Sequence, residues 1–442
     1  MKVSTLTNSQ NFILPLEGKA GLKVFLCFGF AYFLSYAMRA INAIIAPNLI
    51  LDLGVSNTAL GLLSSAYFVG FALMQLPLGV WLDKYGSRRT ESILLLFSVF
   101  GAVVFSFAEN ILWATAGRGF VGVGVSACLM SAFTSYRRWF KPEQQGSLAS
   151  GMLVFGTAGA LMTTIPAQAA LPYIGWRGIF ILMAVLLALS ALAIRYGLPK
   201  AGDPIPFIEE RPFINNPQPA WFSFKWLSGY GEIFKNGFFL QMLPMGIFNQ
   251  GGFMAFQTLW LGPWFRQIVG LNESQVAQTL FLFNGILLCG YIFNAWVMPR
   301  VNKAGVSTFH YSAIISGVAL FVQLFAVTLG NHSFAVVAWY LFGLSATSFI
   351  LGQSVIQTRF PKNIAGRAAT AYNLVLFVGA FFIQWGIGGI IDLLIINDIE
   401  KPQAFTYTVY IMLTFQLVSY IWMWIAPRLL SQQSFEPMAS LD

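Results

Sequence analysis

Long apolar runs separated by short polar segments constrain the fold of this chain more than any other feature of its sequence. Hydrophobic residues make up 57% of the 442 residues and charged residues only 9%, whereas a soluble domain carries about 25% charged residues. Crossing the hydrocarbon core of a bilayer takes about 20 apolar residues in a helix. Backbone polar groups must be paired there, and the runs lack the alternation of membrane strands, so we expect an all-α membrane protein.

We predict twelve transmembrane helices in two groups of six. The first apolar run starts near Leu22 and is longer than a cleavable signal peptide requires, so it counts as a span. A proline-rich segment after the sixth run disfavours helix and separates the groups. The expected spans are residues 21–46, 57–81, 90–108, 111–136, 147–171, 178–197, 236–265, 275–298, 308–329, 334–357, 369–391 and 404–426. The predicted organisation is an N-terminal half (1–197), a cytoplasmic linker loop (198–235) and a C-terminal half (236–442).

Lysine and arginine are distributed unevenly among the connecting segments. With the N-terminus in the cytoplasm, 20 of the 25 fall inside, three (Arg177, Arg266 and Lys401) fall outside, and Arg39 and Arg118 lie within spans. This bias is typical of cytoplasmic loops and predicts that both termini are cytoplasmic. It also accounts for the net charge of +9 without a nucleic-acid partner. The compact loops favour a bacterial inner membrane, and we expect a monomer.

The residues that usually carry enzymatic or metal chemistry are sparse in this chain. Cys27, Cys128 and Cys289 lie far apart in apolar runs, and His310 and His332 are isolated. Such spacing predicts neither a metal site nor a disulfide framework. The sequence contains no Gly-x-Ser-x-Gly motif and no paired acids within the spans. We therefore expect a protein that is not an enzyme and needs no cofactor.

The segment that follows the second span reads Gly-Val-Trp-Leu-Asp-Lys-Tyr-Gly-Ser-Arg-Arg over residues 79–89. Gly79 would let two helices approach closely, and Gly86 would permit a tight turn. Asp83 is suited to pair with a basic group or with a helix N-terminus of the other half. Arg88 and Arg89 would hold the loop in the cytoplasm. A plain positively charged loop is the simpler alternative.

This segment resembles the loop signature of the major facilitator superfamily. Arg118, Gly122 and Gly124 of the fourth span are similar to the R-x-x-x-G-x-G pattern of the same family. The resemblance implies an alternating-access carrier with a central cavity between two six-helix halves. It also implies a gating or structural role for Arg118, with direct substrate contact as the alternative. The Gly-Pro pair that drug–proton antiporters carry in span five is absent, which disfavours a multidrug exporter.

Arg39 lies near the middle of the first span, where a charge costs at least about 2.5 kcal/mol. The stretch Tyr36-Ala37-Met38-Arg39 resembles the Y-A-D-R of anion:cation symporters and the matching arginine of organophosphate exchangers. The resemblance implies that Arg39 binds an anionic group of the substrate, and a guanidinium suits carboxylate or phosphate because it donates two parallel hydrogen bonds. Alternatively, Arg39 is structural and the carrier moves a neutral or amphipathic solute, efflux included.

The acids that accompany this arginine in the related carriers are missing. Met38 replaces the acid of the motif, and Val125 aligns with a fourth-span glutamate. The sixteen acids of the chain fall in tails, loops or span ends, with Asp83, Glu91 and Glu143 at inner ends. Because proton relays use buried Asp, Glu or His, we expect facilitated diffusion or anion exchange rather than proton symport.

Amide side chains within the spans are the remaining candidates for contact with a substrate. Asn249 and Gln250, followed by two glycines, are expected to interrupt span seven as in gating helices. Hydrogen bonds that hold neighbouring helices together are the alternative role. The predicted substrate-binding residues are Tyr36, Arg39, Gln75, Gln168, Asn249, Gln250, Gln257, Asn284, Gln353 and Asn373, and the predicted gating or structural residues are Gly79, Asp83, Gly86, Arg88, Arg89 and Arg118.

These patterns together indicate a secondary active or facilitative transporter of a small organic anion. A carrier of a neutral solute remains the second interpretation. A ligand sensor that evolved from a carrier is a third, and it would bind its ligand without moving it across the membrane.

Overall fold

The computed structural model describes residue 16 and residues 18–141, 144–199, 228–361 and 364–430. Within these ranges the chain is helical and has no strand, as the apolar runs predict. Most of the predicted linker, residues 200–227, lies outside the described ranges. Its last eight residues form a helix, α8 (Ser228–Lys235), so the helix-disfavouring character expected of residues 198–235 does not extend to this end of the segment.

Seven helices make up the described N-terminal half. Two of them contain a glycine with positive φ, Gly86 at +71° in α3 and Gly175 at +63° in α7, at which the helix direction changes. As a consequence, α3 holds the predicted spans two and three, and α7 holds the end of span five together with span six. The helices are α1 (Gly18–Ala40), α2 (Asn42–Leu53), α3 (Asn57–Ser106), α4 (Ile111–Val125), α5 (Cys128–Trp139), α6 (Gln145–Met162) and α7 (Ile165–Gly197).

The described C-terminal half contains more interruptions. The predicted seventh span is a succession of short elements, among them two π-helical segments, η3 and η4, and the predicted tenth span includes a 3₁₀ turn, η5. The elements that follow α8 are α9 (Gly237–Pro244), η3 (Met245–Gly251), α10 (Gly252–Ala255), η4 (Phe256–Trp260), α11 (Leu261–Gln267), α12 (Glu273–Lys303), α13 (Thr308–Leu329), α14 (Ala335–Ala346), η5 (Thr347–Ile350), α15 (Leu351–Arg359), α16 (Ala365–Ile396) and α17 (Lys401–Leu429).

Ten stretches of the described chain are long and apolar enough to cross a membrane. The two remaining predicted spans are interrupted. Span five is α6 followed, after a break at Thr163 and Thr164, by the first turns of α7. Span seven runs from α9 to α11 through both π-helical segments, so the expected interruption at Asn249 and Gln250 takes the form of a wider helix rather than an unwound one. The fold is the twelve-helix arrangement that the sequence predicts.

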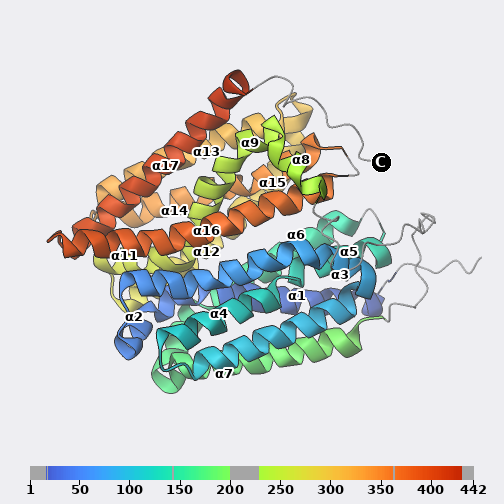
Figure 1. Ribbon diagram of the computed structural model, residues 1–442, viewed down its shortest axis with the longest axis horizontal. Coiled ribbons are helices and arrows are strands. Elements are labelled where there is room, and N and C mark those ends of the chain that lie inside the picture. Colours follow the sequence, from blue (N-terminus) through green and yellow to red (C-terminus); the bar gives the residue numbers. More distant parts are fainter. Residues whose placement is uncertain (1–15, 17, 142–143, 200–227, 362–363, 431–442) are drawn as a thin grey trace, which may run out of the picture.

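The helices form two bundles that lie side by side (Figure 1). The N-terminal bundle, α1–α7, is drawn in blue to green and the C-terminal bundle, α9–α17, in yellow-green to red. α3 and α16 run next to each other along the boundary and make the most extensive contact between the bundles, and α6 packs against α12 at a second line of contact. The boundary between the bundles is therefore formed by helices of both halves.

Glycines bring α3 and α4 together within the N-terminal bundle. A Cβ atom at Gly122 would lie 2.0 Å from the carbonyl oxygen of Tyr67, and one at Gly124 would lie 2.2 Å from the backbone nitrogen of Ser98. Gly79 behaves differently, because it is exposed and no heavy atom of the described residues lies within 4 Å of its Cβ position. The prediction that Gly79 allows two helices to approach is therefore wrong in this structure.

Candidate functional site

A cavity opens between the two halves, bordered by α1 and α6 on one side and by η3, α10, η4, α12, α14 and η5 on the other. About 80 Å³ of it is open to the centre of a water molecule, which is room for several waters at roughly 10–15 Å³ each. We call it the central cavity. It is lined by Tyr36, Arg39, Ala40, Thr157 and Ala160 from the N-terminal half, and by Gln250, Phe253, Met254, Gln257, Thr258, Asn284, Leu287, Tyr291, Ala346, Phe349 and Ile350 from the C-terminal half.

Arg39 supplies a positive charge to the wall of the central cavity. Its guanidinium carbon lies 4.5 Å from the ring centre of Tyr36 and 5.8 Å from that of Tyr67. The rings of Phe71 and Phe377 are each 5.7 Å away. The Nε atom has no hydrogen-bond partner, and no described carboxylate forms an ion pair with the guanidinium.

The aromatic rings stabilise this charge without pairing it. A cation over an aromatic face gains about 0.5–2 kcal/mol, depending on how far it is removed from water. The ring faces accept no strong hydrogen bond, however, and a guanidinium has five N–H donors in a fixed fork. Arg39 is therefore a cation whose buried Nε donor has no partner among the described residues.

Amides face this charge from the C-terminal half. Gln257, in η4, donates from Nε2 to Oδ1 of Asn284 at 3.0 Å, and Asn284, in α12, donates from Nδ2 to the carbonyl oxygen of Leu280 at 2.8 Å. Gln250, in η3, leaves its buried Oε1 without a partner. The C-terminal wall of the cavity thus offers neutral hydrogen-bonding groups. The hydrogen bond between Gln257 and Asn284 fixes these two side chains in position.

The other predicted binding residues lie away from the central cavity. Gln75 is buried and accepts a hydrogen bond of 2.9 Å from Asn373, so these two amides join α3 to α16 across the boundary between the halves. Asn249 is fully buried and donates to the Ser419 hydroxyl and the Gln416 carbonyl oxygen, which ties η3 to α17. All three amides therefore form hydrogen bonds that hold neighbouring helices together, which was the alternative to contact with a substrate.

Gln168 and Gln353 are half-buried and do not line the central cavity. The lining also contains polar groups that were not predicted, chiefly Thr157, Thr258 and Tyr291. Tyr291 follows Asn284 by seven residues on α12, which places both side chains on one face two turns apart. This spacing would have identified Tyr291 from the sequence once Asn284 was chosen.

Arg118 has surroundings unlike those of Arg39. It is only 1% exposed, and its Nη1 donates a hydrogen bond of 2.8 Å to the carbonyl oxygen of Met38. Its guanidinium lies 5.4 Å from the ring centre of Tyr67, the tyrosine that also contacts Arg39. Arg118 does not line the central cavity. The contacts make it a link between α4 and the end of α1, where Arg39 is carried.

The structure describes part of the loop signature at residues 79–89. Gly86 adopts the left-handed conformation expected of a turn glycine. Arg88 donates from Nε to the carbonyl oxygen of Arg195 and so attaches the loop to the end of α7, while Arg89 is exposed. The side chain of Asp83 lies outside the described part of the structure, so its predicted pairing stays a prediction.

Glu91 has an unexpected environment. It follows Gly86 by five residues, about one and a half helical turns, within a stretch able to span the membrane that begins at Lys84. The side chain is fully buried, which its predicted place at an inner end of the span did not indicate. The prediction that no acid lies mid-membrane is not tested by this burial. The related prediction, that transport needs no proton gradient, stays untested.

A carboxylate of α16 joins the halves at the predicted outer end. Asp392 accepts hydrogen bonds of 2.6–3.3 Å from the backbone N–H groups and the side chains of both Asn57 and Thr58. It thereby caps the N-terminus of α3 in the other half, where the helix dipole favours a negative charge. Gly388 permits this contact, since a Cβ there would lie 2.2 Å from the Asn57 carbonyl oxygen.

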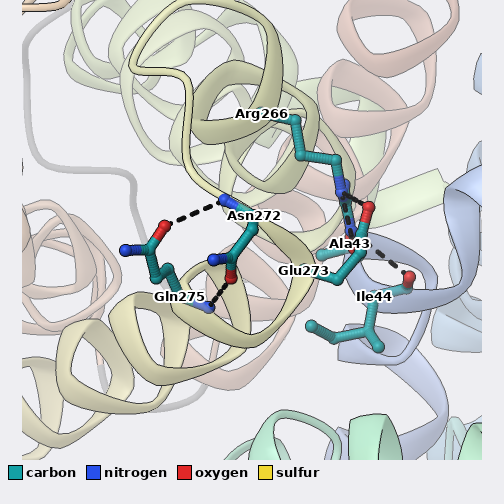
Figure 2. A network of polar contacts seen from close by, with 6 residues as sticks. All are labelled: Ala43, Ile44, Arg266, Asn272, Glu273 and Gln275. Carbon is teal, nitrogen blue, oxygen red and sulfur yellow. Dashed lines mark hydrogen bonds and ion pairs between the residues drawn. The ribbon is translucent and has the colours of Figure 1, made fainter.

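Arg266 makes a second connection at this end (Figure 2). Its Nε donates to both carboxylate oxygens of Glu273, at 2.8 and 2.9 Å, and its Nη atoms donate to the carbonyl oxygens of Ala43 and Ile44 at 3.2–3.4 Å. Glu273 belongs to the first turn of α12, while Ala43 and Ile44 lie in α2 of the other half. The two halves are therefore held together at the predicted outer end by two separate polar contacts.

Comparison with known proteins gives a consistent result. The family model described as Major Facilitator Superfamily matches residues 28–384. The chain is 24% identical over 440 residues to the probable nitrate/nitrite antiporter NarK1 of Thermus thermophilus, with 91% of each chain covered. It is 26% identical over 156 residues, 35% of this chain and 36% of the other, to the probable sulfoacetate transporter SauU of Cupriavidus necator.

A solved structure shows the same fold. The crystal structure of a bacterial homologue of the human lysosomal transporter Spinster, in an inward-facing and unoccupied conformation, superposes with a TM-score of 0.72. The superposition covers 96% of this chain and 100% of that one at 14% sequence identity. At this identity the likeness concerns the arrangement of the helices.

Proposed function

The chain belongs to the major facilitator superfamily, and on that premise we propose that it carries a small organic anion across the membrane by alternating access through the central cavity. The observation that carries the proposal is Arg39, a cation in the cavity wall whose Nε donor is unsatisfied and with which no acid is paired among the described residues. An anion is the ligand that removes the cost of this charge.

The shape and chemistry of the cavity narrow the class of anion. A carboxylate, or a tetrahedral sulfonate through two of its oxygens, accepts two parallel hydrogen bonds from a guanidinium. Tyr36, Phe253 and Phe349 offer apolar surface around the remainder of such a molecule. Gln250 and the bonded pair of Gln257 and Asn284 offer hydrogen bonds at the opposite wall. The space open to solvent favours a molecule of a few heavy atoms over a bulky amphipath.

The named activities of two relatives support this class. The Thermus thermophilus protein is named for nitrate and nitrite, and the Cupriavidus necator protein for sulfoacetate, all of which are small anions. The family and these relatives identify a transporter and not an enzyme. The organic nature of the substrate rests on the apolar part of the lining.

The proposed cycle uses the contacts at the predicted outer end. Asp392 and Arg266 hold the halves together there, so substrate bound at Arg39 is shielded from that side. Opening to the outside requires both contacts to break while the halves close at the inner end. We place both termini in the cytoplasm of a bacterial inner membrane, on the bias of basic residues, so the described conformation faces inward.

Thermal stabilisation by matched ligands tests the proposal. A ligand that binds only the folded state raises its stability by mass action. We expect small carboxylates and sulfonates to raise the melting temperature of the purified protein, and their uncharged amides to leave it unchanged. The charge-matched control for the Arg39→Ala variant is Arg428→Ala, which removes an exposed arginine at the end of α17. This control should respond to the ligands like the wild type. Stabilisation by amides and carboxylates alike would instead support the neutral-solute carrier.

A further inference from the structure

A second, smaller cavity lies inside the C-terminal half, next to the central cavity. About 10 Å³ of it is open to the centre of a water molecule, which is room for one water at roughly 10–15 Å³. Its lining comes from α9, η3, α13, η5, α15, α16 and α17, so it belongs to one half of the protein only. We call it the inner cavity.

Phe349 is the one residue, among those described, that lines both cavities. The residues on either side of it diverge, because Ser348 lines the inner cavity and Ile350 the central cavity. The same alternation occurs in η3, where Asn249 lines the inner cavity and Gln250 the central one. The wall between the cavities is therefore built from η3 and η5, and Phe349 is the residue that reaches both sides of it.

Phe349 is held in this wall by packing. The side chain is buried, and its ring centre lies 6.1 Å from that of Phe253, another residue of the central cavity, at an interplanar angle of 70°. It belongs to the 3₁₀ turn η5, which separates α14 from α15 within one predicted span. A short 3₁₀ stretch inside a helix often marks a hinge. The separation of the two cavities thus depends on the size and position of one apolar ring.

The inner cavity is polar but carries no charge among its described lining residues. Asn249 leaves its buried Oδ1 without a partner, and the hydroxyl oxygens of Ser316 and Ser348 lie 3.4 Å apart. A water molecule or another neutral donor satisfies such groups, whereas a buried charge would need a counter-charge. Three methionines complete the lining, and their unbranched side chains can adjust to a larger occupant.

We propose that Phe349 sets the length of the anion that this carrier accepts, because it closes the central cavity off from the inner cavity. We assign the inner cavity as a subsite for the uncharged, hydrogen-bonding end of a longer anion when the ring is moved aside or shortened. The inference rests on the proposed function, in which Arg39 binds the anionic group. An anion on Arg39 is confined to the central cavity while Phe349 stays in the wall.

Titration calorimetry with unbranched carboxylates, from acetate to hexanoate, tests the role of Phe349. We expect the affinity of the wild type to stop rising at a shorter chain than that of Phe349→Ala. In the variant, each further methylene that leaves water should add about fourfold in affinity. The matched control is Phe405→Ala, which removes a buried ring of α17 that lines neither cavity and should keep the length limit of the wild type.

The polar character of the inner cavity is tested in the Phe349→Ala background. The probes are the ω-hydroxy and ω-fluoro forms of the longest carboxylate that the variant binds, which are similar in size although only the first donates a hydrogen bond. We expect the hydroxy acid to bind about 2- to 10-fold more tightly. Addition of Ser316→Ala, which removes a hydroxyl of the inner cavity, should reduce this preference. Equal affinities, or a preference that Ser316→Ala leaves unchanged, would overturn the subsite.

The outcomes separate this inference from the proposed function. An identical length limit in the wild type and in Phe349→Ala, or a longer limit in Phe405→Ala as well, overturns the role of Phe349 and leaves the anion carrier intact. Absence of carboxylate binding to the wild type overturns both. If Phe349→Ala is not recovered in a folded form, Phe349→Leu, which also removes the ring, decides by the same comparison of length limits.

Discussion

The two walls of the central cavity differ in what they offer a substrate. The N-terminal wall carries the charge of Arg39, held by the ring of Tyr36. The C-terminal wall carries neutral amides, Gln250, Gln257 and Asn284, among apolar side chains. The difference suggests a division of roles, in which the N-terminal half neutralises the charge of the substrate and the C-terminal half recognises its uncharged part.

The backbone geometry also differs between the two walls. Arg39 is at the end of a regular α-helix, and its neighbour Met38 is fixed from behind by Arg118. Gln250 and Gln257 lie instead in two π-helical segments, a geometry that is uncommon in helices and concentrated at functional sites. If the proposed function holds, the wall on the regular helix would supply strong binding and the wall with the π-helical segments would adjust to different substrates.

Removal of the charge should have the largest effect. Loss of a hydrogen bond to a charged group costs about 1.5–3 kcal/mol, which is roughly ten- to a hundredfold in affinity. We expect Arg39→Ala to weaken binding of an anionic substrate by that factor, measured by calorimetric titration. Arg39→Lys should recover little of it, because a lysine cannot donate two parallel hydrogen bonds. Unchanged affinity in both variants, with the fold intact, would assign Arg39 a structural role.

Changes in the neutral wall should have smaller effects of another kind. A neutral hydrogen bond contributes about 0.5–1.5 kcal/mol, so Gln257→Ala and Asn284→Ala should each lower affinity by about 2- to 10-fold. We also expect the order of preference among several anions to change, because the charge is retained while the shape of the wall is altered. Gln168→Ala, outside the cavity, is the matched control. A hundredfold loss in Gln257→Ala would contradict the division between the walls.

One of the two contacts that hold the halves together at the predicted outer end provides a third test. Asp392→Asn removes the negative charge at the N-terminus of α3 and one of the two acceptor oxygens that bind Asn57 and Thr58. We expect a cysteine placed at Ala40 to react several-fold faster with an impermeant thiol reagent added from outside, in a background without the native cysteines. The same labelling after Asn397→Ala, an exposed position near the end of α16, is the control. Equal rates would mean that Asp392 does not limit opening.

The smallest effect is expected at Tyr36. Its ring supports the guanidinium of Arg39, whereas its hydroxyl accepts a hydrogen bond from Tyr32 at 3.3 Å. Because Tyr36→Phe keeps the ring, the change in anion affinity should be less than about twofold. Tyr36→Ala, which removes the ring, should lower it further. A large loss in Tyr36→Phe would show that the hydroxyl itself binds the substrate.

Much of this architecture can be read from the sequence, because the physical signals are strong. Apolar runs, the proline-rich segment and the loop signature predict the helices and the two halves, and a charge at mid-span singles out Arg39. The amides are harder to place. Where a helix is apolar on all sides, no polar stripe marks the face that points to the cavity, so Gln257 and Asn284 could not be distinguished from Gln75 and Asn373.

Contacts between distant residues explain what the sequence could not predict. The cap that Asp392 forms on α3 joins residues 335 positions apart, and no local pattern indicates it. The burial of Glu91 depends on where the turn at Gly86 ends and on which side of α3 meets α5. At Gly79 the sequence predicted close packing of two helices, whereas the structure leaves this glycine exposed. Local sequence determines where helices form. Which face each helix turns toward its neighbours depends instead on contacts between distant residues.

The central claim is that Arg39 binds the anionic group of the substrate. A thermodynamic cycle that removes the charge of the ligand, the charge of residue 39, or both tests this claim most directly. The affinities of a small carboxylate and of its amide are measured by titration calorimetry for the wild type and for Arg39→Met, and the coupling between ligand charge and residue 39 follows from the four values. The account predicts that the wild type prefers the carboxylate by about tenfold or more and that the variant shows no preference. A preference for the carboxylate that persists in Arg39→Met would contradict it.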